Sequence, residues 1–363
     1  GLTVFQMIEP FLGPTVMLAV DDTLAHKRGP HVFGVGMHHD PQLSTRKTPL
    51  VNWGHSWVIA AVLGKFPFCK HRTFALPILF RLYLNKKAAV KAQCEYRTRP
   101  EFAVEMLRKL CLTHENKNFH VVADTAYGGR SVLLNLPSNC DLTSRLQINA
   151  RLYDAPPAHQ TGARGRPRKR GNRLPSPRKM LQMKRCRRIT LDMYGRHNEV
   201  RVRDTEARVH AAPKRPLRVV AVEMLSGNKY QHVFYSTVHD ASAKEVLEWY
   251  AMRWSIEVTF HDTKQHLGFE QPQGWSKRAV ERTAPMAMLL YSLIVLWFAK
   301  VGYRSYRAPK RPWYPEKCRA SFADMLITLR CESIRERFLS MAVRGGGYQK
   351  ILKTLLITVQ QAA

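Results

Sequence analysis

Acidic residues are scarce in this sequence of 363 residues. It contains 27 Asp and Glu against 58 Lys and Arg, which gives a formal net charge of +31 at pH 7. A surplus of this size attracts polyanions and gives binding that weakens as salt is added. No basic amphipathic segment or lipidation motif accompanies the charge, so nucleic acid is favoured over an anionic membrane as the partner.

Paired cysteines and long apolar runs are lacking too. The seven cysteines are an odd number, widely spaced, with no Cys-x-x-Cys pair. This argues against a disulfide framework or structural zinc site and favours a reducing cytosol. The longest apolar run, residues 284–299, is short for a bilayer span and predicts a buried core helix.

Two apolar runs lead into aspartates. Residues 16–20 precede Asp21 and Asp22, and residues 119–123 precede Asp124. Short runs rich in β-branched residues predict buried strands in a mixed sheet covered by helices. Carboxylates just past such strands lie where open α/β sheets bind ligands, although a single one is more typical of a turn or helix cap. The spacing alone does not separate Asp21 from Asp22.

A further carboxylate stands on a predicted helix late in the chain. At about 100° per residue, Tyr250, Arg253, Glu257 and Lys264 fall within an arc of about 60°. Such a face is either a surface laced with salt bridges or a place that holds a metal ion against a phosphate. Three carboxylates from two strands and a helix could bind two Mg²⁺ ions about 4 Å apart, with Mn²⁺ as a substitute, for in-line phosphoryl displacement.

Composition divides the chain into three predicted parts. Residues 1–150 read as an α/β core, in which residues 86–112 have helical spacing broken at Pro100, and residues 241–363 read as helical. Between them, residues 151–240 form a basic, mostly β insertion. Its first part resembles the AT-hook, whose arginines enter the minor groove of A·T-rich DNA, and a solvated basic linker is an equal alternative. The DNA-binding residues predicted there are Arg164, Arg166, Arg168, Lys169 and Arg170.

Together these motifs resemble those of bacterial insertion-sequence transposases. Asp-Asp-Thr and Ala-Asp-Thr end the two strands, and Tyr-x2-Arg-x3-Glu-x6-Lys lies on the late helix. The segments RWSIEVTFHDTKQHLGFEQPQ and SFADMLITLR are similar to those of the same enzymes, so that the resemblance runs from about residue 16 to about residue 342. Enzymes of this DDE branch, with its Tyr-Arg-Glu-Lys signature, have an RNase H-like fold.

The resemblance implies a catalytic, metal-binding triad of Asp22, Asp124 and Glu257. Asp22 is chosen over Asp21 because the family's aspartate stands directly before the threonine. The implied reaction is Mg²⁺-dependent cleavage at transposon ends, followed by transfer of the 3′-OH to target DNA. The implied setting is the bacterial cytoplasm, at the nucleoid.

The same resemblance implies that Tyr250, Arg253 and Lys264 hold transposon-end phosphates, in a homodimer that synapses two DNA ends. No membrane and no small-molecule substrate are expected. Members normally carry a helical DNA-binding domain before the first aspartate, and only 21 residues precede Asp22, so a missing N-terminal part is expected. An RNase H-like nuclease without strand transfer, and a non-catalytic DNA-binding remnant, are the alternatives.

Overall fold

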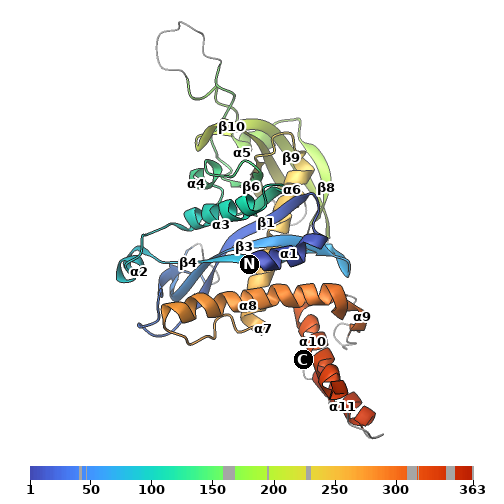
Figure 1. The fold of residues 1–363 in the computed structure, drawn as a ribbon. Helices are drawn as coiled ribbons and strands as arrows, with labels where there is room; N and C mark the ends of the chain where they lie inside the picture. The colour runs from blue at the N-terminus through green and yellow to red at the C-terminus, as the bar shows by residue number, and fades with distance from the viewer. Residues whose placement is uncertain are drawn as a thin grey trace.

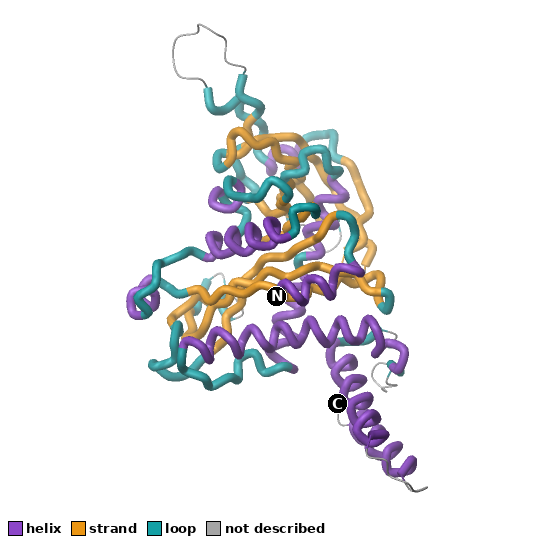
Figure 2. The backbone as a smooth tube through the Cα atoms, in the orientation of Figure 1, coloured by secondary structure: helices purple, strands orange, loops and turns teal. Residues whose placement is uncertain are grey.

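A computed structural model of the chain describes residues 1–40, 43–45, 47–157, 168–193, 196–225, 230–308, 317, 319–340 and 348–361. Within these residues the fold is built on one mixed sheet of eleven strands with helices on both of its faces (Figures 1 and 2). The predicted α/β class, a mixed sheet flanked by helices, is therefore confirmed.

The sheet runs in the order β2-β3-β1-β5-β6-β11-β10-β9-β7, and β4 and β8 pair with β3 and β9. The pairs β1–β5 and β5–β6 are parallel, and the other pairs are antiparallel. The strands are β1 (Thr15–His26), β2 (Gly36–His39), β3 (Val51–Phe66), β4 (Cys69–Tyr83), β5 (Asn118–Ala123), β6 (Cys140–Leu146), β7 (Leu152–Tyr153), β8 (Arg187–Met193), β9 (Arg196–Val209), β10 (Ala212–Met224) and β11 (Gln231–Ser236).

The helices begin at identifiable caps. Ser242 begins α6 and Thr98 begins α3, each in a capping box with a glutamate three residues later. Pro100 lies in the first turn of α3, where a proline is tolerated, so the expected break in residues 86–112 separates two helices. The helical elements are α1 (Leu2–Ile8), η1 (Glu9–Phe11), α2 (Lys86–Lys91), α3 (Arg99–Thr113), α4 (Arg130–Leu133), α5 (Pro177–Gln182), α6 (Ala243–Met252), α7 (Trp254–His266), α8 (Lys277–Trp297), η2 (Phe298–Gly302), α9 (Tyr303–Ser305), α10 (Phe322–Ser340) and α11 (Tyr348–Gln361).

The two faces of the central strands pack against different helices. On β1, Leu18 and Val20 belong to the core that includes α3, whereas Ala19 and Ala25 pack in the cluster that includes Ile256 of α7. Successive side chains of a strand point to opposite faces. Odd-numbered positions of β1 therefore face α7, and even-numbered positions face α3.

The strands of the basic insertion continue the central sheet. β11 pairs with β6, and β10, β9 and β8 follow outward, with α6 packed over them (Figure 1). The predicted antiparallel strands of this region are present, and they extend the sheet that carries Asp124. The division of the chain into three domains stays a prediction.

Helix α8 packs along β4. The helical stretch Lys277–Ser305 has the length and composition of a membrane span, with a mean hydropathy of 1.8 over its most apolar 18 residues, but 56% of that window is buried inside the protein. This burial is typical of the core helix of a globular protein, which was the predicted role of the apolar run.

Candidate active site

Neighbouring strands bring two of the aspartates side by side. The parallel pairing of β1 with β5 ends at Val20 and Ala123, so Asp21 and Asp124 stand side by side one position further. On the other side of β5, pairing with β6 brings Ser144 beside this point, and its Oγ donates to the Asp124 carbonyl at 2.8 Å. Asp124 follows the last residue of β5, as the sequence predicts.

Asp21 faces the helix that carries the third carboxylate. Its Oδ2 accepts a 2.8 Å hydrogen bond from Nη1 of Arg253. The Nη2 of the same guanidinium donates to Glu257 Oε1 at 2.5 Å. One cation thus bridges two carboxylates that are far apart in the sequence.

The pKa of Asp21 is raised from 3.8 to about 8, chiefly by burial; Arg253 opposes the rise, and the negative charges of Asp124 and Asp22 add to it. The register of β1 and β5 brings Asp21 beside Asp124, where the two charges interact. A buried carboxyl of this kind favours its neutral form unless additional positive charge is supplied. The pKa of Arg253 is raised, because the charges of Asp21, Tyr250 and Glu257 outweigh its burial.

Asp22 lies on the opposite face, away from Glu257. The Tyr127 hydroxyl donates to its Oδ1 at 2.7 Å, and Arg99 Nε lies 3.2 Å from its Oδ2. Arg99 in turn donates to the Ser56 hydroxyl at 3.0 Å. The structure therefore does not bring Asp22 together with Asp124 and Glu257, as was expected. The reason is that β1 continues through both Asp21 and Asp22, and its side chains alternate between the two faces.

The strand that was expected to end at residue 20 is longer for a clear reason. Antiparallel β3 continues to pair with β1 up to His26, beyond the point where β5 ends. Asp21 and Asp22 are therefore strand residues rather than residues of a loop. Because side chains alternate along β1, the odd or even position of each aspartate decides which of the two lies on the α7 face.

The predicted helical stripe lies across β1. The helix is divided at Arg253, which keeps helical angles (φ −55°, ψ −35°) between α6 and α7, so the direction of the side chains is preserved. Arg253 contacts Asp21, and about three helical turns further along α7 the Nζ of Lys264 donates to the Leu24 carbonyl at 2.6 Å.

Tyr250 is buried beside this contact. Its ring lies 4.5 Å from the ring of Phe234 on β11, and the Arg253 guanidinium lies 5.6 Å from its centroid. Its buried hydroxyl has no hydrogen-bond partner among the described residues. Burial raises the pKa of this phenol, and the charge of Arg253 acts against that rise.

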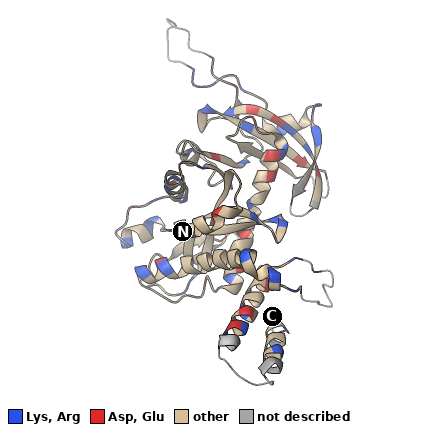
Figure 3. Ribbon diagram, turned by 45° about the vertical axis from the view of Figure 1, so that its right-hand side comes forward, with Lys and Arg blue, Asp and Glu red and all other residues tan. Residues whose placement is uncertain are grey.

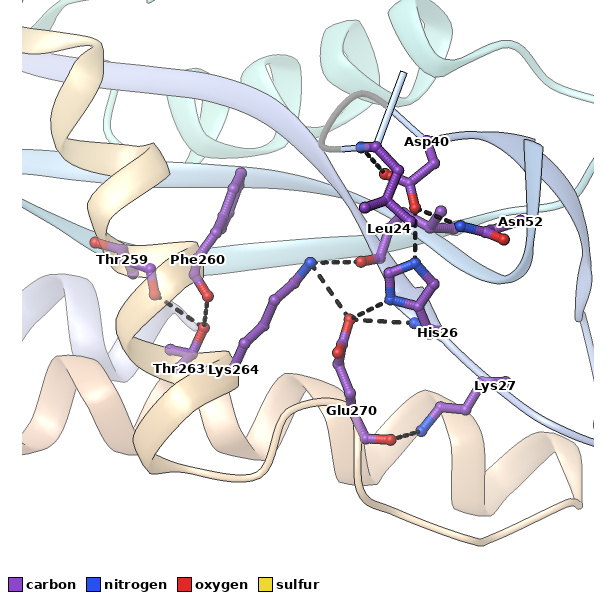
Figure 4. Close-up of polar contacts among 11 residues, drawn as sticks. Leu24, His26, Lys27, Asp40, Asn52, Thr259, Phe260, Thr263, Lys264 and Glu270 are labelled. Atoms are coloured by element: carbon purple, nitrogen blue, oxygen red, sulfur yellow. Dashed lines mark hydrogen bonds and ion pairs between the residues drawn. The ribbon is translucent and has the colours of Figure 1, made fainter. Parts of the chain in front are cut away.

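A polar network holds Lys264 at the far end of the stripe (Figure 4). The Nζ of Lys264 lies 3.3 Å from Glu270 Oε1, which also accepts from the His26 backbone N–H at 3.1 Å. The ring of His26 lies between two carboxylates, with Nδ1 3.2 Å from Glu270 and Nε2 2.8 Å from the buried Asp40. Asn52 Nδ2 donates to the same Asp40 oxygen at 2.7 Å.

The AT-hook-like residues are only partly covered by the structure. Arg164 and Arg166 lie outside the described residues. Arg168 and Lys169 are exposed, and the Arg170 guanidinium lies 5.3 Å from the centroid of the Tyr153 ring. Figure 3 shows Lys and Arg interspersed with acidic residues on the neighbouring strands.

The carboxylates offer oxygen ligands of the kind that Mg²⁺ prefers, but they do not form a preassembled metal site. Within the described ranges, no group of three His, Cys, Asp or Glu side chains is placed to hold a metal ion. The Arg253 guanidinium occupies the space between Asp21 and Glu257. The residues fit a divalent cation on the condition that Arg253 gives up these two contacts.

Three neighbours of this site were not predicted from the sequence. Arg145 on β6, whose guanidinium lies 6.0 Å from the Phe234 ring beside Tyr250, and Tyr127, in the turn after Asp124, are not marked by their local spacing. Glu270 stands in the late segment HLGFEQPQ that contributed to the resemblance, and its contact with Lys264 follows only from the turn after α7. Asp21 was recognised as an alternative to Asp22, and the alternation of β1 distinguishes the two.

Half-buried carboxylates thus lie side by side under a helix that contributes two cations. A sequence model of the DDE superfamily endonucleases matches residues 2–209, and the chain belongs to this family. The match includes Asp21, Asp22 and Asp124, whereas α6 and α7 follow it. No curated protein matches the chain.

Proposed function

We propose that the protein is a DNA transposase, which cleaves DNA at the ends of a mobile element and joins the resulting 3′-OH to target DNA. Family membership supports the cleavage of nucleic acid. The observation that carries the proposal is the bridge from Asp21 through Arg253 to Glu257, with Asp124 beside Asp21. The net charge of +31 supports a polyanionic substrate.

Asp21, Asp124 and Glu257 are the proposed ligands of divalent metal ions, and Mg²⁺ with Mn²⁺ as a substitute fits their oxygen chemistry. When bound, such ions activate an attacking oxygen and stabilise a leaving one in an in-line displacement. This assignment replaces Asp22 with Asp21. Asp22, fixed by Tyr127 and Arg99, is proposed to hold β1 in position beneath the site.

Arg253 and Lys264 are proposed to bind phosphate oxygens of the DNA. Arg offers a planar fork for two oxygens of one phosphate, and Lys offers a mobile point charge. When Arg253 leaves the carboxylates, its guanidinium becomes available to the scissile phosphate, and Tyr250 lies beneath it as a buried support. We propose that two copies act on two DNA ends, in the bacterial cytoplasm at the nucleoid.

Nicking of supercoiled plasmid in Mg²⁺ or Mn²⁺ tests the carboxylates. Asp124→Asn and Glu257→Gln should abolish nicking, and Asp240→Asn, which changes an exposed aspartate outside the site, should retain it. Equal nicking by the wild type and the two site variants would refute the assignment. Inactivity of all of them, with DNA binding retained, would leave a non-catalytic DNA-binding protein.

A joining assay separates a transposase from a nuclease. A labelled duplex with a free 3′-OH at the cleaved end is incubated with unlabelled plasmid, and covalent transfer of the label is measured. Metal-dependent transfer that is lost in Asp124→Asn is the expected result. Cleavage without any transferred label would refute the joining step and favour an RNase H-like nuclease.

A further inference from the structure

An open hollow of about 670 Å³ begins directly beside Asp124, one of the proposed metal ligands. Its first lining residue, Thr125, follows Asp124, and the hollow extends over β6 and β11 to the start of α5. Its lining is rich in hydrogen-bond donors, among them Thr125, Arg145, Asn149, Ser176, Arg178 and His232.

No acidic side chain lines this hollow among the described residues. Glu223 on β10, which accepts a 2.9 Å hydrogen bond from the lining residue Gln231, is also paired with Arg201 at 2.6 Å. The Arg178 side chain is exposed and forms no ion pair with any described residue. The lining of the hollow therefore carries a net positive charge.

Arg145 and His232 form a paired donor on its floor. Arg145 Nη2 donates to Nδ1 of His232 at 2.9 Å, so the imidazole proton is on Nε2 and can be donated to a ligand. Burial and the adjacent Arg145 charge lower the pKa of His232, which keeps the ring neutral. The remaining N–H groups of the Arg145 guanidinium are left to bind an anion.

The same arginine is joined to the proposed catalytic residues. Arg145 is paired with Phe234 of β11, and its guanidinium lies 6.0 Å from that ring. Phe234 also packs against Tyr250, whose ring lies 4.5 Å away and in turn contacts Arg253. Arg145 thus lies on the α7 face of the sheet, in the row that contains Asp21 and Asp124.

We propose that this hollow binds the sugar–phosphate backbone of the DNA strand next to the bond that is cut. Arg145 and His232 contact the phosphate neighbouring the scissile one, and Arg178 contacts a phosphate further along the strand. The occupant is a nucleic-acid strand because the hollow is open, free of acidic groups and continuous with the carboxylates that act on a phosphodiester. The inference rests on the proposed function and names the path of its substrate.

Salt dependence of binding tests the charge of the hollow. Binding of a fluorescent duplex is measured in EDTA, without cleavage, for Arg145→Ala and Arg178→Ala. The control Arg108→Ala removes the same charge from an exposed position on α3, across the sheet. Each hollow variant should lower the slope of log Kd against log salt by about 0.9, the value for one phosphate contact on duplex DNA, and the control should lower it much less.

A second measurement locates the contact. Once the cut is mapped, the phosphate next to it is replaced by an uncharged methylphosphonate. Wild type and Arg108→Ala should bind the modified duplex more weakly than the unmodified one. Arg145→Ala should bind both duplexes equally, because it already lacks the contact that the methylphosphonate removes, and coupled changes are not additive. Equal losses in all three proteins, or unchanged salt slopes in both hollow variants, would overturn the proposal.

The salt slopes are measured without cleavage and are independent of the catalytic assignment, whereas the methylphosphonate measurement follows once a cut is mapped. If nicking survives Asp124→Asn, the proposed function fails whatever the salt slopes are. If nicking depends on Asp124 but neither hollow variant changes the slope or the methylphosphonate effect, the strand path alone is wrong.

Discussion

Replacing Asp21 and Asp22 one at a time by asparagine should have very different effects on DNA cleavage. The two residues are adjacent, and the two substitutions are chemically identical. The two carboxylates have different partners, since Asp21 contacts Arg253 and Asp22 contacts Tyr127 and Arg99. Comparing the two variants therefore tests whether successive side chains of β1 point to opposite faces of the sheet.

The expected sizes follow from these contacts. A metal ligand that helps to stabilise charge in the transition state contributes several kcal/mol, and about 4 kcal/mol corresponds to roughly a 10³-fold loss of rate. Asp21→Asn should lose at least this much. In Asp22→Asn the amide oxygen can still accept from the Tyr127 hydroxyl, so the loss should stay within the roughly 10- to 100-fold range of residues that support metal ligands.

Single-turnover nicking of plasmid in saturating Mn²⁺ measures both rates, and thermal unfolding without metal confirms that both variants are folded. A deeper loss in Asp22→Asn than in Asp21→Asn would refute the assignment of Asp21. Equal losses of about 10³-fold would mean that both faces of β1 contribute to the reaction, and would contradict the separation argued from the structure.

Three further outcomes are expected. The pKa of Asp21 is raised from 3.8 to about 8, so the folded protein keeps a proton that the unfolded chain releases, and the free energy of unfolding should fall as the pH rises from about 4 to about 8. Asp21→Asn has no such proton, and denaturant titrations without metal should show a flatter pH profile; parallel profiles would contradict the raised pKa. Glu270→Gln removes the negative charge beside Lys264, so it should strengthen DNA binding and steepen its salt dependence in anisotropy titrations. The control Glu115→Gln, at an exposed position, should have a smaller effect. Unchanged binding by Glu270→Gln would show that Lys264 does not reach DNA. Tyr127→Phe removes the hydroxyl that donates to Asp22, and it should lower the free energy of unfolding by about 1 to 3 kcal/mol in denaturant titrations. An unchanged free energy of unfolding would mean that this hydrogen bond does not stabilise β1.

The sheet was predictable where apolar runs are uninterrupted, and β4 shows where that reasoning stops. Residues 69–83 contain Pro77, which argues against a strand because proline lacks an N–H donor. The structure accommodates it on a strand at the outer side of β3, with a register shift beside it: Ala60 pairs with Leu79 and Ala61 with Pro77. Bulges and outer strands are the places where a sheet tolerates proline, but a bulge is set by the partner strand and is not visible in the sequence of β4 alone.

The carboxylates show the same limit at the scale of single side chains. The helical stripe was predictable because a period of 3.6 residues is local, and the junction at Arg253 keeps helical angles, so the order of Arg253, Glu257 and Lys264 survives the division into α6 and α7. The phase of β1 was not predictable, because both of its faces are buried and apolar residues therefore occur at odd and even positions alike. Only the helices above and below the strand distinguish its faces. That tertiary contact, and not the position of a carboxylate before a threonine, decides that Asp21 meets Arg253 while Asp22 turns to Tyr127.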